Sequence, residues 1–325
     1  MEQNENEFFG QRTNLLPIAE VVERVRQEVA KVIVGQHEMV DLLITALLAD
    51  GHVLIEGVPG VAKTLTAKVL ARILDVPFSR IQFTPDLMPS DVLGTSIFNL
   101  KTSDFEFRRG PIFANIVLID EINRAPAKTQ AALFEVMEER QITIDGNQYA
   151  LTAPFLVIAT QNPVESRGTY PLPEAQMDRF AIQFSLGYIS PEEEVNLLSD
   201  QIQQHPIDTI QSSVDLQDII TLKTLVKQIR ISTELKRYLV DIVNATRIAE
   251  GVQLGASPRA SITLMKIAQA LALFDGYEFV TPEHIQELAV AVIAHRLVME
   301  PQARFSGKTA AGVVEDIVKS VPVPI

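Results

Sequence analysis

The sequence predicts an α/β protein in which a central parallel sheet is followed by an all-helical domain. From about residue 15 to residue 184, short β-rich apolar runs alternate with helical patterns, as in a parallel sheet covered by helices. One apolar run ends in a glycine-rich turn, and another ends in two adjacent carboxylates. From residue 190 onward the pattern becomes helical and no clear strand pattern returns. We therefore expect one domain over residues 1–187 and a second over residues 188–325, with the boundary near Gly187.

The first domain contains five candidate strands, at residues 53–56, 80–83, 116–119, 155–158 and 181–184. The third and fourth are almost continuously apolar, which is typical of strands buried on both faces. Two further segments, 93–107 and 141–151, have the pattern of β-hairpins. In the second, Asp145 and Gly146 separate two β-rich runs, a strong hairpin signal.

The sequence of the second domain contains patterns typical of helix N-termini and of helices with one apolar face. Leu235, Leu239 and Ile242 fall on one face of a helix because their spacing is i, i+4, i+7. An N-cap residue followed by proline at the first helical position predicts three helix starts, at residues 190–191, 257–258 and 281–282.

Composition narrows the class of protein. The chain has 325 residues, 47% hydrophobic and 21% charged, which is an ordinary globular balance. It has no cysteine, which excludes disulfides and thiolate metal sites, and its five histidines show no ligand spacing. The polar, acidic start lacks the features of a signal peptide, and no apolar run approaches the roughly 20 residues of a membrane helix. We expect a cytoplasmic protein.

The net charge of −13 argues against a nucleic-acid partner. Affinity for DNA or RNA comes largely from lysine and arginine side chains against phosphates.

The glycine-rich turn after the first strand predicts a phosphate-binding loop. Backbone N–H groups at such a turn, opening onto a helix N-terminus, bind phosphate oxygens. Lys63 is expected to reach the β- and γ-phosphates, and the Thr64 hydroxyl to bind Mg²⁺. The usual glycine before the lysine is replaced by Ala62, which keeps its N–H; the alternative is an ordinary Gly-Pro turn with a solvated lysine. The stretch comprises Gly57, Val58, Pro59, Gly60, Val61, Ala62, Lys63 and Thr64, with Leu65 continuing into the helix.

Asp120 and Glu121 follow the strand at residues 116–119. In an α/β sheet, the carboxyl ends of parallel strands form the ligand-binding edge, so this pair is expected beside the phosphate loop. Asp120 is expected to hold Mg²⁺, and Glu121 to orient and deprotonate the attacking water. The alternative is a solvated turn, which is the commoner meaning of such a pair on its own.

Three further residues could complete a hydrolytic site. Asn162 follows the fourth strand and could bind both the water and the γ-phosphate; its alternative is an Asn-Pro turn. Arg179 precedes the last strand and could act on a neighbouring subunit's γ-phosphate. Arg259 lies in a helix's first turn, where helix and guanidinium together favour an anion. For both arginines the alternative is a solvated surface position.

Together these residues resemble the AAA+ superfamily and, within it, the MoxR family closely. The resemblance runs from about residue 33 to residue 259, and more loosely to the C-terminus. It implies a P-loop AAA+ core followed by a helical lid domain. The blocks that carry it are residues 109–113, 119–126, 128–130, 137–146, 159–163 and 168–176.

The resemblance also implies roles at matching positions. Val34, Gly35 and Gln36 look like the segment that lies against adenine. Asn162 looks like sensor 1, Arg179 like the arginine finger and Arg259 like sensor 2. The hairpins at 93–107 and 141–151 look like the helix-2 and pre-sensor-1 inserts, which commonly face the ring pore and touch substrate. Ala62 is compatible with MoxR-like loops, and the resemblance leaves the role of Arg124 open.

What the resemblance implies for function is a Mg²⁺- and ATP-dependent hydrolase that forms a homo-oligomeric, hexameric ring. Proteins of this family are regarded as chaperones that mature or remodel client complexes, often with partners that carry von Willebrand factor A domains. Two alternatives stay open: a motor acting on nucleic acid, and a scaffold that holds nucleotide without turnover. The sequence does not identify the client, the ring stoichiometry or whether the partner is membrane-bound.

Overall fold

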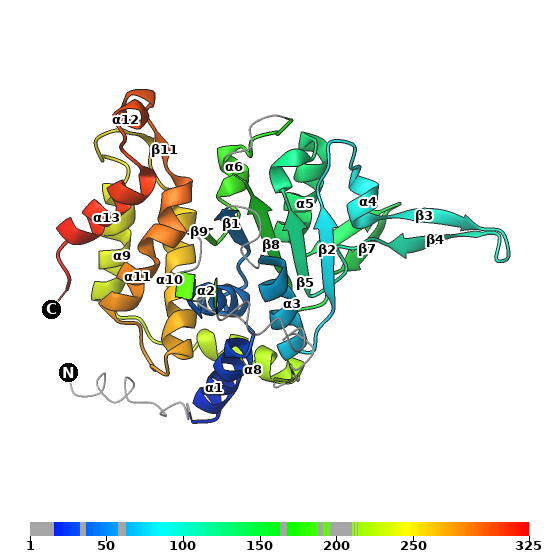
Figure 1. The fold of residues 1–325 in the computed structure, drawn as a ribbon, viewed down its shortest axis with the longest axis horizontal. Helices are drawn as coiled ribbons and strands as arrows, with labels where there is room; N and C mark the ends of the chain where they lie inside the picture. The colour runs from blue at the N-terminus through cyan, green and yellow to red at the C-terminus, as the bar shows by residue number, and fades with distance from the viewer. Residues whose placement is uncertain are drawn as a thin grey trace, which may run out of the picture.

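The computed structural model describes residues 16–32, 37–57, 63–162, 168–187, 191–192, 194–195, 210, 212 and 214–324. An α/β part and a helical part lie side by side, and one long hairpin projects away from both (Figure 1).

The α/β part is built on a five-stranded parallel sheet with the order β2-β5-β8-β1-β9. Each strand matches one of the five predicted runs to within a few residues, which confirms the predicted sheet. Because all five strands are parallel, their carboxyl ends share one edge. The strands are β1 (Val53–Gly57), β2 (Phe78–Gln82), β5 (Ile116–Asp120), β8 (Leu156–Gln161) and β9 (Ile182–Leu186).

Helices cover both faces of the sheet. Alternate strand residues point to opposite faces, so Val53 and Ile55 join the core beneath α1, α2 and α3, whereas Leu54 packs with Leu133 and Phe134 of α5 on the other face. The helices of this part are α1 (Leu16–Ala30), α2 (His37–Leu48), α3 (Lys63–Ile73), α4 (Pro89–Leu93), α5 (Ala127–Glu139) and α6 (Glu174–Met177), with a 3-10 turn η1 (Ile122–Arg124).

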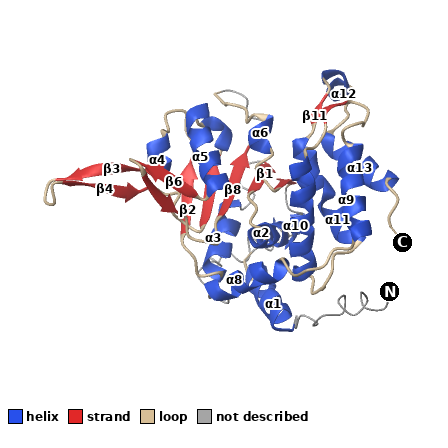
Figure 2. Cartoon of the chain, turned by 180° about the vertical axis from the view of Figure 1, so that it is seen from behind, coloured by secondary structure: helices blue, strands red, loops and turns tan. Residues whose placement is uncertain are grey.

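Both predicted hairpins are present. One pairs β3 (Gly94–Asn99) with β4 (Asp104–Arg109) and projects from the α/β part (Figure 2); the other pairs β6 (Gln141–Ile144) with β7 (Asn147–Ala150). The β6–β7 hairpin, including its turn, touches the β3–β4 hairpin. The rings of Phe107 and Tyr149 lie 4.3 Å apart between centroids, and Ser96 Oγ donates to the Asp145 carboxylate at 2.5 Å.

The helical part confirms the predicted helix starts at Ser257 and Thr281, each of which is an N-cap. Leu235, Leu239 and Ile242 are buried on one face of α9, as predicted. The start predicted at residues 190–191 lies largely outside the described residues. The helices here are α8 (Leu216–Val226), α9 (Thr233–Ala245), α10 (Pro258–Phe274), α11 (Pro282–Ile293), α12 (Pro301–Phe305) and α13 (Ala310–Ser320), with a 3-10 turn η3 (Ala294–Arg296).

The helical part also contains a small antiparallel ribbon, formed by β10 (Val252–Leu254) and β11 (Val298–Met299). The expectation that no strand returns after residue 190 is therefore wrong in this detail. Strands of three and two residues are too short for an alternating pattern to show in the sequence. No described helix combines the length and the apolar character that crossing a bilayer requires.

The two parts share a continuous core. Buried residues of α8, α9, α10 and α11 join the cluster that lies under the α2 and α3 face of the sheet. Gly187 is the last residue described before residues 188–190, so the boundary placed there stays a prediction.

Candidate functional site

The carboxyl edge of the sheet gathers polar side chains from three neighbouring strands. β1 ends at Gly57, β5 ends at Asp120, and β8 lies between them. Asp120 and Gly57 are therefore two strand spacings apart, roughly 10 Å. Gly57, at which the predicted phosphate loop begins, and the acidic pair therefore lie at the same edge of the sheet.

Lys63 is the first residue of α3, and its ammonium turns back toward the edge of the sheet. Its Nζ donates to the carbonyl of Gly57 at 2.7 Å. Burial lowers the pKa of Lys63, while the carboxylates of Asp120, Glu121 and Glu56 oppose that shift. The lysine therefore lies within electrostatic reach of both members of the acidic pair.

Gly57 occupies a position that only glycine fits. Its φ of 150° is rarely adopted by residues with a side chain, and an added Cβ would lie 2.8 Å from the carbonyl oxygen of Leu186. Thr64 and Leu65 follow Lys63 in the first turn of α3 and are half-buried. The predicted nucleotide-binding residues 34–36 and 58–62 lie outside the described residues.

Asp120 is a buried carboxylate with two partners. Arg80 Nε donates to its Oδ2 at 2.6 Å, and Thr160 Oγ1 donates to its Oδ1 at 3.3 Å. Arg80 is the middle residue of β2 and Thr160 lies near the end of β8, the strands on either side of β5. These two donors fix the direction of the carboxylate, which suits a ligand for a hard cation.

Glu121 has a left-handed backbone, with φ 58° and ψ 53°, a strained conformation for a residue with a side chain. Such strain concentrates at functional sites. Its N–H donates to Thr160 Oγ1 at 3.1 Å, and its Oε2 accepts from Gln82 Nε2 at 3.0 Å and from Arg124 Nε at 2.8 Å. The sequence left the role of Arg124 open, and in the structure it restrains Glu121.

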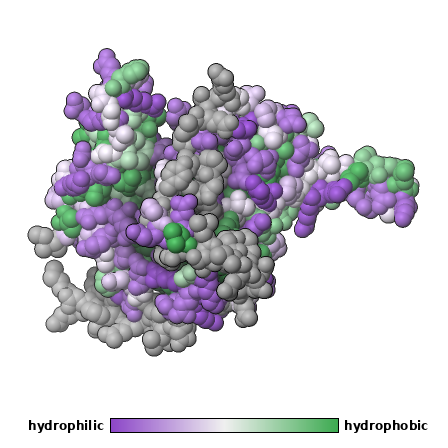
Figure 3. Space-filling view, viewed as in Figure 1, coloured by the Kyte–Doolittle hydropathy of each residue, from purple (hydrophilic) through white to green (hydrophobic). Residues whose placement is uncertain are grey.

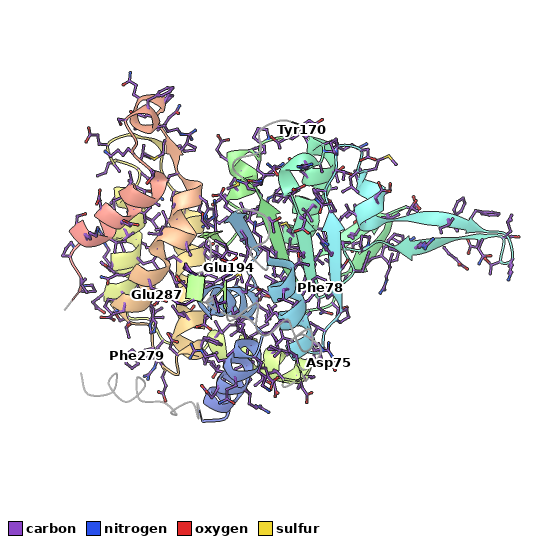
Figure 4. All side chains as sticks on the ribbon, viewed as in Figure 1. Asp75, Phe78, Tyr170, Glu194, Phe279 and Glu287 are labelled. Atoms are coloured by element: carbon purple, nitrogen blue, oxygen red, sulfur yellow. The ribbon has the colours of Figure 1, made fainter. Side chains whose placement is uncertain are left out.

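The turn after Glu121 is itself held by a residue far along the chain. The N–H of Tyr170 (Figure 4) donates to the carbonyl of Asn123 at 2.6 Å. Gln130 Nε2 donates to the carbonyls of both Ile122 and Tyr170, each at 3.1 Å. These bonds fix the backbone that sets the direction of the Glu121 side chain.

Sequence reasoning missed three residues of this edge: Arg80, Gln82 and Thr160. Arg80 and Gln82 are two residues apart on β2 and therefore share a face of that strand. This spacing of two polar residues is the sequence signal that could have identified them. Asn162, which was predicted, follows β8 directly and is half-buried. Its neighbour Gln161 donates from Nε2 to Glu56 Oε1 at 2.6 Å, joining β8 to β1.

Arg179 and Arg259 lie at the opposite edge of the sheet. Both bind Glu138 in the last turn of α5: Arg179 Nη2 to Oε2 at 3.0 Å, and Arg259 Nη2 to Oε1 at 2.5 Å. They line a pocket of about 340 Å³ together with Gly51 and Ala181, the residues just before β1 and β9. The structure therefore brings the two arginines to each other and keeps both away from Lys63 and Asp120 of the same chain.

A buried ion pair anchors this arginine-bearing edge. Arg296 Nε donates to Asp178 Oδ1 at 2.7 Å, and Ser257 Oγ donates to Asp178 Oδ2 at 3.2 Å. Burial lowers the pKa of Arg296, and the hydrogen bond that Arg296 donates to Asp178 opposes that shift. Asp178 precedes Arg179 and Ser257 caps the helix that carries Arg259, so one carboxylate joins both segments.

Comparison with known families places both parts of the chain. Residues 52–182 match the model of the ATPase family associated with various cellular activities (AAA). Residues 244–317 match the model of the AAA lid domain. The first match contains Lys63 and the acidic pair, and the second contains Arg259.

Several curated relatives are similar over most of their length. Chaperone MoxR1 of Mycobacterium tuberculosis is 42% identical over 93% of this chain and 82% of the relative. Protein MoxR of Methylorubrum extorquens is 30% identical over 92% of each chain. The uncharacterized protein YeaC of Bacillus subtilis is 50% identical over 92% of this chain and 93% of the relative.

A solved structure has the same fold. The crystal structure of a candidate ATPase from Cytophaga hutchinsonii superimposes with a TM-score of 0.88 at 40% identity. The match covers 96% of this chain and 97% of the other.

Proposed function

Because the chain belongs to the MoxR family of AAA+ ATPases, we propose that it hydrolyses Mg²⁺-bound ATP within a homo-oligomeric ring to remodel or mature a client protein complex. The observation that carries the proposal is the split of the site residues between two edges of one sheet. Lys63, Asp120 and Glu121 lie at the carboxyl edge, and Arg179 and Arg259 lie at the other.

The carboxyl edge has the donors that a magnesium-bound triphosphate needs. Thr64 and Asp120 supply the hard oxygen ligands that Mg²⁺ prefers, and Lys63 supplies a cation for the β- and γ-phosphates. Backbone N–H groups of residues 58–62 would cradle the phosphates, and residues 34–36 would lie against the adenine. When bound, Mg²⁺ neutralises charge on the β- and γ-phosphate oxygens.

Hydrolysis requires a base at the γ-phosphate, and in this proposal that base is Glu121. In the structure Gln82 and Arg124 both bind its Oε2, and its Oε1 would accept the proton of the attacking water. Asn162, at the end of β8 between the two site strands, would orient the same water and the γ-phosphate. Glu121 then takes the water's proton.

The two arginines suit a site completed by a neighbouring subunit. A five-residue strand spans about 15 Å, so residues at one edge do not reach a ligand at the other. In a closed ring, the arginine edge of one subunit faces the carboxyl edge of the next. Arg179 and Arg259 would then stabilise charge on the neighbour's γ-phosphate, with Arg259 acting alongside the finger.

Subunit mixing tests this arrangement. Glu121→Gln and Arg179→Ala should each abolish turnover on their own while leaving nucleotide binding intact. Mixed at equal amounts and allowed to reassemble, they should regain activity. Random mixing pairs an intact Glu121 with an intact neighbouring Arg179 at about one interface in four.

The alternatives predict different results. If Arg179 acted within its own chain, every subunit of the mixture would carry a defect and activity would stay at zero. A scaffold without turnover would show no hydrolysis in the wild-type chain at any protein concentration. Wild-type turnover in the Arg179→Ala ring would refute the assignment of the arginine finger.

The client-handling part of the proposal is supported by the projecting hairpin. Its outer half exposes large apolar side chains, visible as green at the end of the projection in Figure 3. Exposed apolar surface of this kind marks a site of contact with another protein. The side chains are Ile97, Phe98, Leu100 and Phe105, with Leu100 85% exposed.

A further inference from the structure

Glu138 binds the two arginines at once, one on each carboxylate oxygen. Arg179 belongs to the α/β part and Arg259 to the helical part, so a single side chain of α5 joins the two. Each arginine uses one Nη2 nitrogen for this contact, and the guanidinium has other N–H donors to offer.

Helix α5 fixes Arg179 by a second contact on the same face. The guanidinium carbon lies 5.9 Å from the ring centroid of Phe134, one turn before Glu138. Phe134 is fully buried and packs edge-on against Phe180. The helix therefore presents to the arginine a rigid apolar face and a carboxylate in fixed relation to each other.

Two other arginines of the pocket have counter-ions of their own. Arg296 is paired with Asp178, and Arg140 binds Asp50. The hydrogen bond from Arg259 lowers the pKa of Glu138, which stays ionised at neutral pH. Without that carboxylate, two guanidinium groups would face each other across the pocket and repel.

We propose that Glu138 is a positioning residue that holds Arg179 and Arg259 as a two-pronged clamp for one anion, the terminal phosphate of the neighbouring subunit's nucleotide. This inference rests on the proposed function. Two oxygens of a carboxylate are spaced much like two oxygens of a phosphoryl group. Guanidiniums that converge on one therefore converge on the other.

The first test compares isosteric variants. Glu138→Gln removes the charge and should lower kcat about tenfold, with nucleotide affinity unchanged, because the arginines act on the neighbour's transition state. Glu138→Asp keeps the charge on a shorter side chain, so it should lose less of the wild-type kcat than Glu138→Gln does. The matched control is Glu135→Gln, an exposed glutamate one turn earlier on α5 with no ion pair in the described structure; it should retain wild-type kcat.

Subunit mixing separates positioning from a general structural defect. Glu138→Gln chains mixed with Glu121→Gln chains should regain activity, because about one interface in four joins an intact base to an intact clamp. Glu138→Gln mixed with Arg179→Ala should stay at or below the level of Glu138→Gln alone, since both defects lie on the same side of the interface. Thermal unfolding of each variant checks that the chains are folded.

Three outcomes would overturn the inference: kcat unchanged in Glu138→Gln, kcat raised in it, or recovery of activity with Arg179→Ala. A raised kcat would mean that Glu138 competes with the phosphate. If Glu121→Gln and Arg179→Ala fail to complement each other, the proposed function itself fails. If they do complement and Glu138→Gln is wild-type, only the role of Glu138 fails.

Discussion

Neutralising Asp178 should destabilise the whole chain, because its partner Arg296 is almost completely buried. The Arg296 side chain is 2% exposed, and its other bonds go to backbone carbonyls, including that of Phe180 at 2.7 Å. Removing one partner of a buried ion pair costs about 3–5 kcal/mol, since a charge is left buried without compensation. The asparagine in Asp178→Asn can still accept the bond from Arg296, and the Asp178 side chain is 22% exposed. We therefore expect Asp178→Asn to lower the free energy of unfolding by an amount at the low end of this range, about 3 kcal/mol.

Urea unfolding of wild type and Asp178→Asn measures this loss. Asp241→Asn is the matched control, because Asp241 pairs with the exposed Arg237 one turn away on α9; it should change stability by less than about 1 kcal/mol. Adding Arg296→Met to Asp178→Asn should recover part of the loss, since the uncompensated charge is then gone. Equal, small effects for Asp178→Asn and Asp241→Asn would refute the reasoning that the pair is buried and anchors the arginine edge.

His52 should make the fold sensitive to acid. Full burial lowers its pKa to about 4, while the ring accepts from the N–H of Val157 and donates to the carbonyl of Met137. An unfolded histidine titrates near 6.5, so stability is fully present above that pH and is lost as pH falls toward 4, by roughly 3 kcal/mol. Urea unfolding at pH 7 and pH 5 should show a smaller change in the free energy of unfolding for His52→Gln than for wild type. An equal change in the two proteins would contradict this. On the projecting hairpin, Phe98→Ser with Phe105→Ser should weaken binding of a labelled unfolded polypeptide such as casein about tenfold and leave basal ATPase unchanged; unchanged anisotropy titrations would remove the hairpin from client contact.

Much of the fold follows from local pattern. A strand such as β5 is buried along its whole length, so its apolar run is continuous in the sequence and hard to mistake. The hairpin at residues 141–151 was predictable because Asp145 and Gly146 both adopt positive φ in the turn, as Asp-Gly pairs favour. The β10–β11 ribbon was not predictable, since its pairing joins segments more than 40 residues apart through very few residues.

The site was predictable only to the extent that topology dictates it. Parallel strands share a carboxyl edge, so Lys63 and Asp120 had to lie near each other once the strands were assigned. Nothing local marks Arg80 or Gln82 as partners of the acidic pair, because that depends on β2 being placed next to β5. The position of Arg259 depends on how α10 packs against the end of α5, which no short-range pattern specifies.

Helix α5 connects the two edges of the sheet. It begins just after the turn that holds Glu121 and ends at Glu138 and Glu139, and its 13 residues span roughly 20 Å. The buried face of α5, with Leu133, Phe134 and Met137, packs into the core under the sheet. Because this core is close-packed, we expect the helix to respond to a force as one rigid element. When Arg179 and Arg259 bind a neighbour's phosphate, a pull on Glu138 through these arginines would therefore act on the same helix that starts beside Glu121, the proposed base. In the proposed ring, one helix would therefore connect the site that a subunit carries with the site that it completes on its neighbour.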